Sequence, residues 1–110
     1  MEKRIGIWIN GKPLYRKMLE IPNIKGGNGR QYASTDTDIS NLNINEVVKI
    51  KSVLVGSDGY TVDGNSWNTN TALSVGTFIV EKNILRVRTN QEWAEGYTAL
   101  VTLYYTKTTD

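Results

Sequence analysis

The chain has 110 residues, 39% of them hydrophobic, and its 13 basic and 11 acidic residues give a net charge of +2. This length favours a single domain over residues 1–110 with one small core. The chain contains no cysteine or histidine, which excludes disulfides, thiolate or histidine metal sites and the histidine-dependent catalytic triads.

Two further classes of partner are not expected. The basic residues are too few and too scattered for a nucleic-acid footprint, so we expect no nucleic-acid binding. No apolar run approaches the roughly 18 residues of a membrane helix, so we expect no membrane insertion.

A hairpin is predicted near the beginning of the chain. The run at 5–9 alternates isoleucine with glycine and tryptophan, and Asn10-Gly11 follows it directly. Asn-Gly is the preferred pair for a type I′ turn, in which both central residues have positive φ. The return strand should cover 12–21. Pro13, which has no N–H, should place its start at a sheet edge, and Pro22 should end it.

Residues 22–45 form the least regular stretch. A Gly-Gly-Asn-Gly sequence at 26–29 indicates an open loop, and the Ser-Thr-Asp-Thr-Asp run at 34–38 has turn or helix-capping chemistry. We expect at most a short helical turn between Asp36 and Leu42. A connection of this length in a small domain is usually functional or part of a subunit contact.

Short β-strands are predicted over the rest of the chain. The turn residues at 56–59 and 81–83 separate runs rich in β-branched and aromatic side chains. The predicted strands are 47–55, 60–62, 72–80, 84–89 and 97–107.

The last of these strands is the most regular. Alternate side chains of a strand point to opposite faces. One face of the final run is wholly apolar or aromatic, and the other mixes threonine with Leu100 and Tyr104. The first face, expected in the core, carries Tyr97, Ala99, Val101, Leu103 and Tyr105. This strand should be central in an all-β fold, a small antiparallel β-sandwich of about six to eight strands or a small barrel.

Two short motifs carry a resemblance to a known family. The run Trp8-Ile-Asn-Gly-Lys-Pro-Leu-Tyr-Arg-Lys17 resembles the Trp-Ile-Asp/Asn-Gly-Lys-Pro-Ile/Leu-Tyr-Arg-Lys opening of C-terminal domains of tail-fibre and receptor-binding proteins, from phages and prophages of Firmicutes and related bacteria. The ending Tyr105-Thr-Lys-Thr-Thr-Asp110 resembles the tail that closes many of those chains. Asn10 stands where aspartate is common and keeps the turn chemistry. The motifs cover 16 residues, and the middle of the chain does not align with the family.

The resemblance implies a location and a partner. It implies a β-rich head domain in the virion tail, at the tip of a fibre or baseplate, assembled as a homotrimer, with a fibre shaft preceding Met1 in the whole protein. Within the first motif we favour a structural role, because Trp8 and Tyr15 are large amphipathic side chains suited to covering one end of a core. Arg16 and Lys17 should be solvated.

A candidate glycan site lies in the polar loops. Sugars present apolar C–H faces and hydroxyl groups, so their sites tend to combine aromatic rings with Asp and Asn side chains, and binding residues concentrate in loops. The residues with these properties are Tyr60, Asp63, Asn65, Trp67, Asn68 and Trp93. The alternative is that Trp67 and Trp93 fold back as lids over the core.

No catalytic residue, metal site or cofactor is assigned. Asp36 and Asp38 could act as a glycosidase pair only if they flanked a cleft. Calcium binding by Asp58, Asp63 and Asn65 misses the EF-hand spacing, and Asx turns are the more economical explanation of these residues. The function expected is therefore non-enzymatic adhesion to a bacterial surface glycan or other receptor. The alternatives are a purely structural trimerisation or capping domain and, less favoured, a glycan-degrading tail enzyme.

Overall fold

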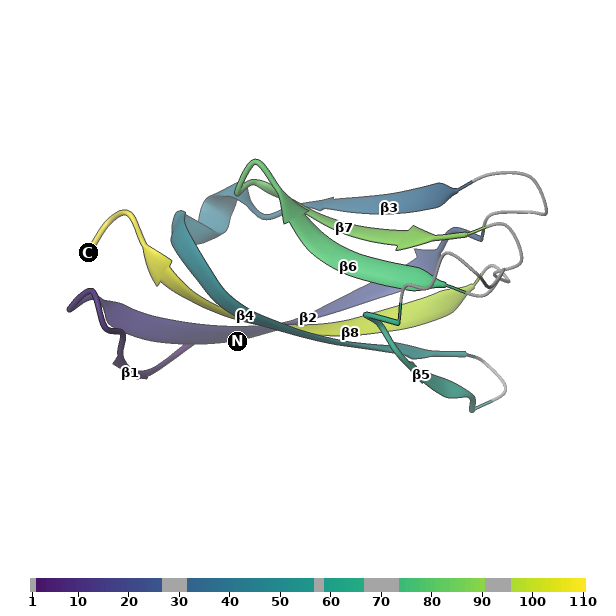
Figure 1. The fold of residues 1–110 in the computed structure, drawn as a ribbon, viewed down its shortest axis with the longest axis horizontal. Helices are drawn as coiled ribbons and strands as arrows, with labels where there is room; N and C mark the ends of the chain where they lie inside the picture. Colours follow the sequence, from purple (N-terminus) through teal and green to yellow (C-terminus); the bar gives the residue numbers. More distant parts are fainter. Residues whose placement is uncertain (1, 27–31, 57–58, 67–73, 91–95) are drawn as a thin grey trace.

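Two antiparallel sheets face each other in the computed structural model, which describes residues 2–26, 32–56, 59–66, 74–90 and 96–110 (Figure 1). The larger sheet has the strand order β1-β2-β8-β4-β5, and the smaller has the order β3-β7-β6. The predicted all-β sandwich is confirmed, and the sheets do not close into a barrel. The elements are β1 (Lys3–Ile7), β2 (Pro13–Ile24), β3 (Ala33–Asp38), a 3-10 helix η1 (Ser40–Leu42), β4 (Ile44–Val55), β5 (Thr61–Asp63), β6 (Val75–Val80), β7 (Ile84–Thr89) and β8 (Tyr97–Lys107).

Strand β8 is the centre of the larger sheet, as the sequence predicts. It pairs with β2 on one side and with β4 on the other over most of its length. Its apolar face is buried from Ala99 to Tyr105, whereas Leu100 on the opposite face is 41% exposed. Tyr97, predicted to be buried, is only half-buried, because it lies at the end of the strand and packs against the margin of the core.

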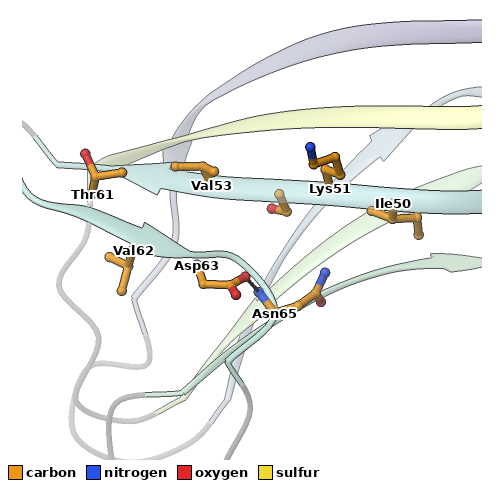
Figure 2. A pocket seen from close by; sticks show the side chains of 8 residues that line it. Ile50, Lys51, Val53, Thr61, Val62, Asp63 and Asn65 are labelled. Atoms are coloured by element: carbon orange, nitrogen blue, oxygen red, sulfur yellow. Dashed lines mark hydrogen bonds between the residues drawn. The ribbon is translucent and has the colours of Figure 1, made fainter.

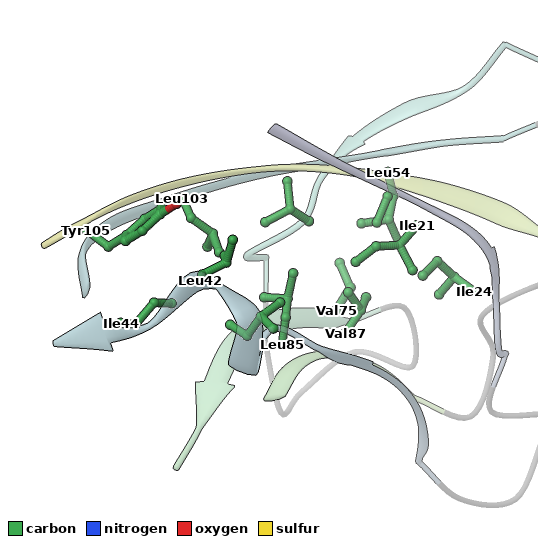
Figure 3. Packing of buried hydrophobic residues seen from close by; sticks show 13 residues of the cluster. Ile21, Ile24, Leu42, Ile44, Leu54, Val75, Leu85, Val87, Leu103 and Tyr105 are labelled. Atoms are coloured by element: carbon green, nitrogen blue, oxygen red, sulfur yellow. The ribbon is translucent and has the colours of Figure 1, made fainter. Parts of the chain in front are cut away.

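The core lies between the two sheets (Figure 3). The larger sheet contributes side chains from β2, β4 and β8, and the smaller contributes Val75, Leu85 and Val87. Ile39 and Leu42, around η1, extend the same cluster. The helix therefore buries apolar side chains in the connection between β3 and β4.

The first hairpin forms, with a turn other than the predicted one. The N–H of Gly11 donates to the carbonyl of Trp8, and the N–H of Trp8 donates to Lys12, both at 2.9 Å. Gly11 has a φ of +83°, but Asn10 is not among the residues with positive φ, so the turn is not type I′. A three-residue loop ending on a left-handed glycine explains this geometry.

The two prolines occupy positions that the sequence does not reveal. Strand β2 is interior; Pro13 is its first residue and pairs with β1 before the β8 ladder begins at Tyr15. The first residue of a strand also tolerates a missing N–H. Strand β2 continues past Pro22 to Ile24 through an irregular register in which Asn23 has a φ of 59°. A bulge of this kind accommodates a proline without ending the strand.

The stretch at 22–45 is more ordered than predicted. It contains β3, which pairs with β7 throughout its six residues. The helical turn is confined to Ser40–Leu42, and Asp36 belongs to the strand. The other predicted strands are confirmed as β4, β5, β6 and β7, within the described residues.

The molecule is elongated and leaves β1 uncovered. Its principal extents are 45 × 26 × 23 Å, and its radius of gyration of 14.8 Å exceeds the roughly 13 Å of a compact domain of this length. All five residues of β1 are exposed. Ile7 is 67% exposed, and Ile9 in the following turn is 91% exposed. An exposed edge strand that carries isoleucines can pair with another chain, and its Lys3 and Arg4 restrict which surfaces can do so.

Candidate functional site

Three of the six predicted glycan-site residues lie in the described part of the chain. Tyr60 precedes β5 and is 69% exposed, Asp63 ends β5, and Asn65 lies in the turn that follows. The remaining three, Trp67, Asn68 and Trp93, lie outside the described residues.

An open groove of about 540 Å³ lies beside β5 (Figure 2). It forms where β4 continues beyond its short pairing with β5, which covers only Val53 to Val55. Both Asp63 and Asn65 line the groove, and Lys51 places a cationic side chain on it. Its walls come from Ile50, Lys51, Ser52, Val53, Thr61, Val62, Asp63 and Asn65. The groove therefore offers charge, amide and apolar surface together.

Asp63 and Asn65 also hold their own turn. The Asp63 carboxylate accepts a hydrogen bond from the N–H of Asn65 at 2.9 Å, which is an Asx turn (Figure 2). The side-chain oxygen of Asn65 accepts one from the N–H of Thr77 at 2.8 Å. The Asx-turn interpretation of Asp63 is thus confirmed. Both side chains remain exposed, so these bonds orient them at the rim of the groove.

A buried polar contact between β4 and β6 supports this turn, and the sequence did not predict it. The hydroxyls of Ser52 and Thr77 lie 2.8 Å apart, and Thr77 donates to the carbonyl of Gly64 at 2.9 Å. The N–H of Gly64 donates to the carbonyl of Ser52 at 2.8 Å. Because Ser52 is on β4 and Thr77 is on β6, the contact ties the two sheets together beneath Asp63. The one sequence feature that hints at this contact is the glycine at position 64, because a glycine lets another chain segment approach its backbone closely.

Hydrogen bonds join several strand ends near the groove. The Ser66 N–H donates to the carbonyl of Val75, and the side chain of Asn90 accepts from the N–H of Ser74. Gly96 donates to the carbonyl of Ile24. These hydrogen bonds join the ends of β2, β6, β7 and β8 at one rim of the sandwich (Figure 1).

The two sequence motifs meet at the opposite end. The rings of Tyr15 and Tyr105 stack with centroids 6.1 Å apart, and the Tyr15 hydroxyl donates to Asp110 at 2.8 Å. That hydrogen bond raises the pKa of Tyr15. Lys12 donates to the carbonyl of Lys107 at 3.1 Å, and the Lys107 ammonium lies 4.7 Å from the Tyr15 ring centroid. The opening and closing motifs thus form one contact cluster.

Glu2 completes this cluster. It accepts hydrogen bonds from the Tyr105 hydroxyl and, at 2.6 Å, from the ammonium of Lys107. Partial burial alone would raise the pKa of Glu2, but these two hydrogen bonds and the positive charges of Lys107 and Lys17 together outweigh it, and the pKa is lowered. The pKa of Tyr105 is raised, mainly because the phenol is partly buried and also because it donates a hydrogen bond to Glu2. The arrangement fits a neutral phenol against a carboxylate.

Trp8 has an adjacent role. Its indole N–H donates to the carboxylate of Glu46 at 2.7 Å, which joins the first turn to β4. Tyr15 packs against the core, as the structural interpretation of the motif expects, whereas Trp8 is half-buried and is not among the side chains that pack on it. Arg16 and Lys17 are half-buried rather than fully solvated.

The remaining carboxylates are engaged in structure. The Asp36 carboxylate accepts hydrogen bonds from Nε and Nη2 of Arg86, which lowers the pKa of Asp36. The pKa of Asp38 is also lowered, because its carboxylate accepts from the N–H of Ser40. Both residues line an open hollow of about 500 Å³ beside η1. A glycosidase general acid has a raised pKa, whereas the pKa of each of these carboxyls is lowered. Within the described ranges there is no group of three or more His, Cys, Asp or Glu side chains that could hold a metal ion.

Comparison of the chain with protein-family models, curated proteins and solved structures finds no match in any of the three. None of the described helices is long and apolar enough to cross a membrane. The site must therefore be interpreted from its own chemistry and from the two motifs.

Proposed function

We propose that this domain is the distal head of a phage or prophage tail fibre, a non-enzymatic module that contacts the bacterial surface, with a glycan as its receptor. The observation that carries the proposal is a division between the two ends of the sandwich. Tyr15, Tyr105 and Asp110 of the recurring motifs are engaged in holding the chain ends together. Recognition then falls to the opposite end, where the groove beside β5 offers polar groups and Tyr60, next in sequence to its lining residue Thr61, is an exposed aromatic side chain outside the groove lining.

Binding of the labelled domain to bacterial cells and to a glycan array tests this proposal. Replacing Tyr60 with alanine should weaken binding about tenfold, a loss typical of an aromatic contact residue, while the unfolding midpoint stays unchanged. The control is Met18→Ala, which removes an exposed apolar side chain from the outer face of β2.

Three results would contradict the proposal. Equal losses for Tyr60→Ala and Met18→Ala would remove Tyr60 from the binding surface. Absence of binding to every cell type and glycan would favour the second candidate, a trimerisation or capping domain. Release of reducing sugar from a bound glycan would instead indicate a tail enzyme.

The partner we propose for β1 is a second copy of this chain in a homotrimer. Strand β1 is the outermost strand of its sheet, and its free backbone edge lies beside exposed isoleucines. Because Lys3 and Arg4 make this strand basic, the copy must meet β1 with a surface other than its own β1, as in the head-to-tail contact of a cyclic trimer. A copy bound through Ile5, Ile7 and Ile9 buries apolar surface without a foreign protein.

Light scattering after size-exclusion chromatography tests the trimer. Ile7→Lys should convert a trimer into a monomer at micromolar concentration, because a charge at an apolar interface is costly to desolvate. The control Thr61→Lys adds the same charge at the far end of the molecule and should remain trimeric. A wild-type monomer under these conditions would refute self-association.

A further inference from the structure

Arg88 stands out on the outer face of the smaller sheet. On β7 it lies opposite Ser34 of β3 and Gly76 of β6. Its guanidinium carbon is 5.6 Å from the ring centroid of Tyr32 and 5.9 Å from that of Phe78. Its Nε is shielded from solvent and has no hydrogen-bond partner in the described part of the chain. A shielded donor without a partner is costly and calls for an explanation.

Arg86, on the same face of β7, has the carboxylate partner that Arg88 lacks. Arg86 forms a bidentate pair with Asp36, with nitrogen–oxygen distances of 2.8 and 2.9 Å. Both oxygens of Asp36 are thereby occupied. Neither of the ion pairs among the described residues involves Arg88. Two arginines thus share a face on which one nearby carboxylate is already engaged.

The chemistry of this arrangement favours an anionic ligand. A guanidinium held against aromatic rings keeps a fixed plane. With Nε shielded, its two terminal nitrogens, Nη1 and Nη2, are the donors that match the two oxygens of a carboxylate or phosphate. Tyr32 is 60% exposed beside it and presents an aromatic surface to solvent. Ser34, opposite Arg88 on β3, adds a hydroxyl to this face. These groups are suited to a molecule with one anionic group and one apolar face.

We propose that Arg88 binds the carboxylate or phosphate of an acidic sugar, with Tyr32 contacting the sugar ring. This inference rests on the proposed glycan-binding function and adds a second, charge-selective contact to it. Phe78 positions the guanidinium from the other side. The affinity for a monosaccharide should be in the millimolar range, since one bidentate contact must offset the cost of association.

The Nε–Hε signals of the arginines in an NMR titration provide the test. Glucuronate and glucose 6-phosphate are the acidic probes, one for each anion, and glucose is the neutral control. Both acidic sugars should shift the Arg88 signal, whereas glucose should not. Arg88→Gln should weaken binding of the acidic sugars at least about tenfold. Arg88→Lys, which keeps the charge without the bidentate geometry, should give an intermediate loss.

A matched variant separates a site from general charge. Arg16→Gln makes the same charge change on β2 of the other sheet and should bind the acidic sugars as the wild type does. Equal binding of glucuronate and glucose, or binding unchanged in both Arg88 variants, would overturn the proposal. If Arg88→Gln does not fold, Arg88→Lys decides the outcome on the same readout.

The outcome can be distinguished from failure of the proposed function. If cells bind through Tyr60 but neither acidic sugar shifts Arg88, the adhesion function stands and the Arg88 site is wrong. If the acidic sugars bind at Arg88 but no cell or glycan array binds the domain, the site stands and the adhesion function is wrong.

Discussion

Leu103→Ala is expected to cost about 2–5 kcal/mol in the free energy of unfolding, the range for deleting a buried leucine side chain. Leu103 is fully buried at the middle of β8, between Lys17 of β2 and Ile50 of β4 in the strand register. Strands on both sides restrict collapse around the truncated side chain, so a cavity should remain. Urea unfolding monitored by tryptophan fluorescence measures the loss from the shift in midpoint at constant slope.

The same strand offers a matched control. Leu100→Ala makes the identical truncation on the opposite face of β8, where the side chain is 41% exposed, and should cost less than about 1 kcal/mol. Losses of similar size in the two variants would mean that both faces of β8 are covered. A loss below about 0.5 kcal/mol for Leu103→Ala would contradict its place in the core.

The strands that sequence predicts well are those with one apolar face. Strand β8 has the predicted bounds because its buried side chains alternate without interruption from Ala99 to Tyr105. Strand β3 lacks this signal. Its inward positions include Thr35 and Thr37, opposite Val87 and Leu85 of β7. A strand that contributes small, polar side chains at the edge of a sheet cannot be told from a loop by periodicity.

The backbone conformation at Pro22 and Asn23 depends on tertiary packing. Pro22 was predicted to end β2 because a proline breaks a regular ladder. The strand continues because Asn23 takes a positive φ and Ile24 returns to the core. The gain from burying Ile24 is a property of the folded sandwich and cannot be read from the residues near Pro22.

The sequence predicts only those features of the candidate site that form between residues close together in the chain. The Asp63-Gly-Asn65 sequence predicts an Asx turn, and the turn is present. The contact of Ser52 with Thr77 joins residues 25 positions apart, and the position of Arg88 depends on Tyr32 and Phe78 from two other parts of the chain. Such contacts follow from the packing of strands, which no local pattern specifies.

Gly64→Ala is expected to destabilise the domain by about 1–3 kcal/mol or more, as overpacking does in a tightly packed site. A Cβ at Gly64 would overlap the Ser52 hydroxyl and would lie 2.5 Å from the Ser52 Cβ and 2.9 Å from its carbonyl carbon. Rotation of the hydroxyl cannot relieve the last two contacts, so β4 and the β5 turn must separate. Urea unfolding measures the loss, and Gly6→Ala is the control because a Cβ at Gly6 meets nothing within 4 Å.

A second variant tests whether the overlap is with the hydroxyl or with the strand itself. Ser52→Ala removes the hydroxyl but keeps the Cβ and the backbone of β4, so combining it with Gly64→Ala should not restore stability. Separation of the turn should also move Asp63 and Asn65 at the rim of the groove, which their amide NMR signals would report. A Gly64→Ala variant as stable as Gly6→Ala, with these signals unmoved, would show that the turn does not pack on Ser52. The groove beside β5 would then lack the rigid floor on which the proposed glycan contact at this end depends.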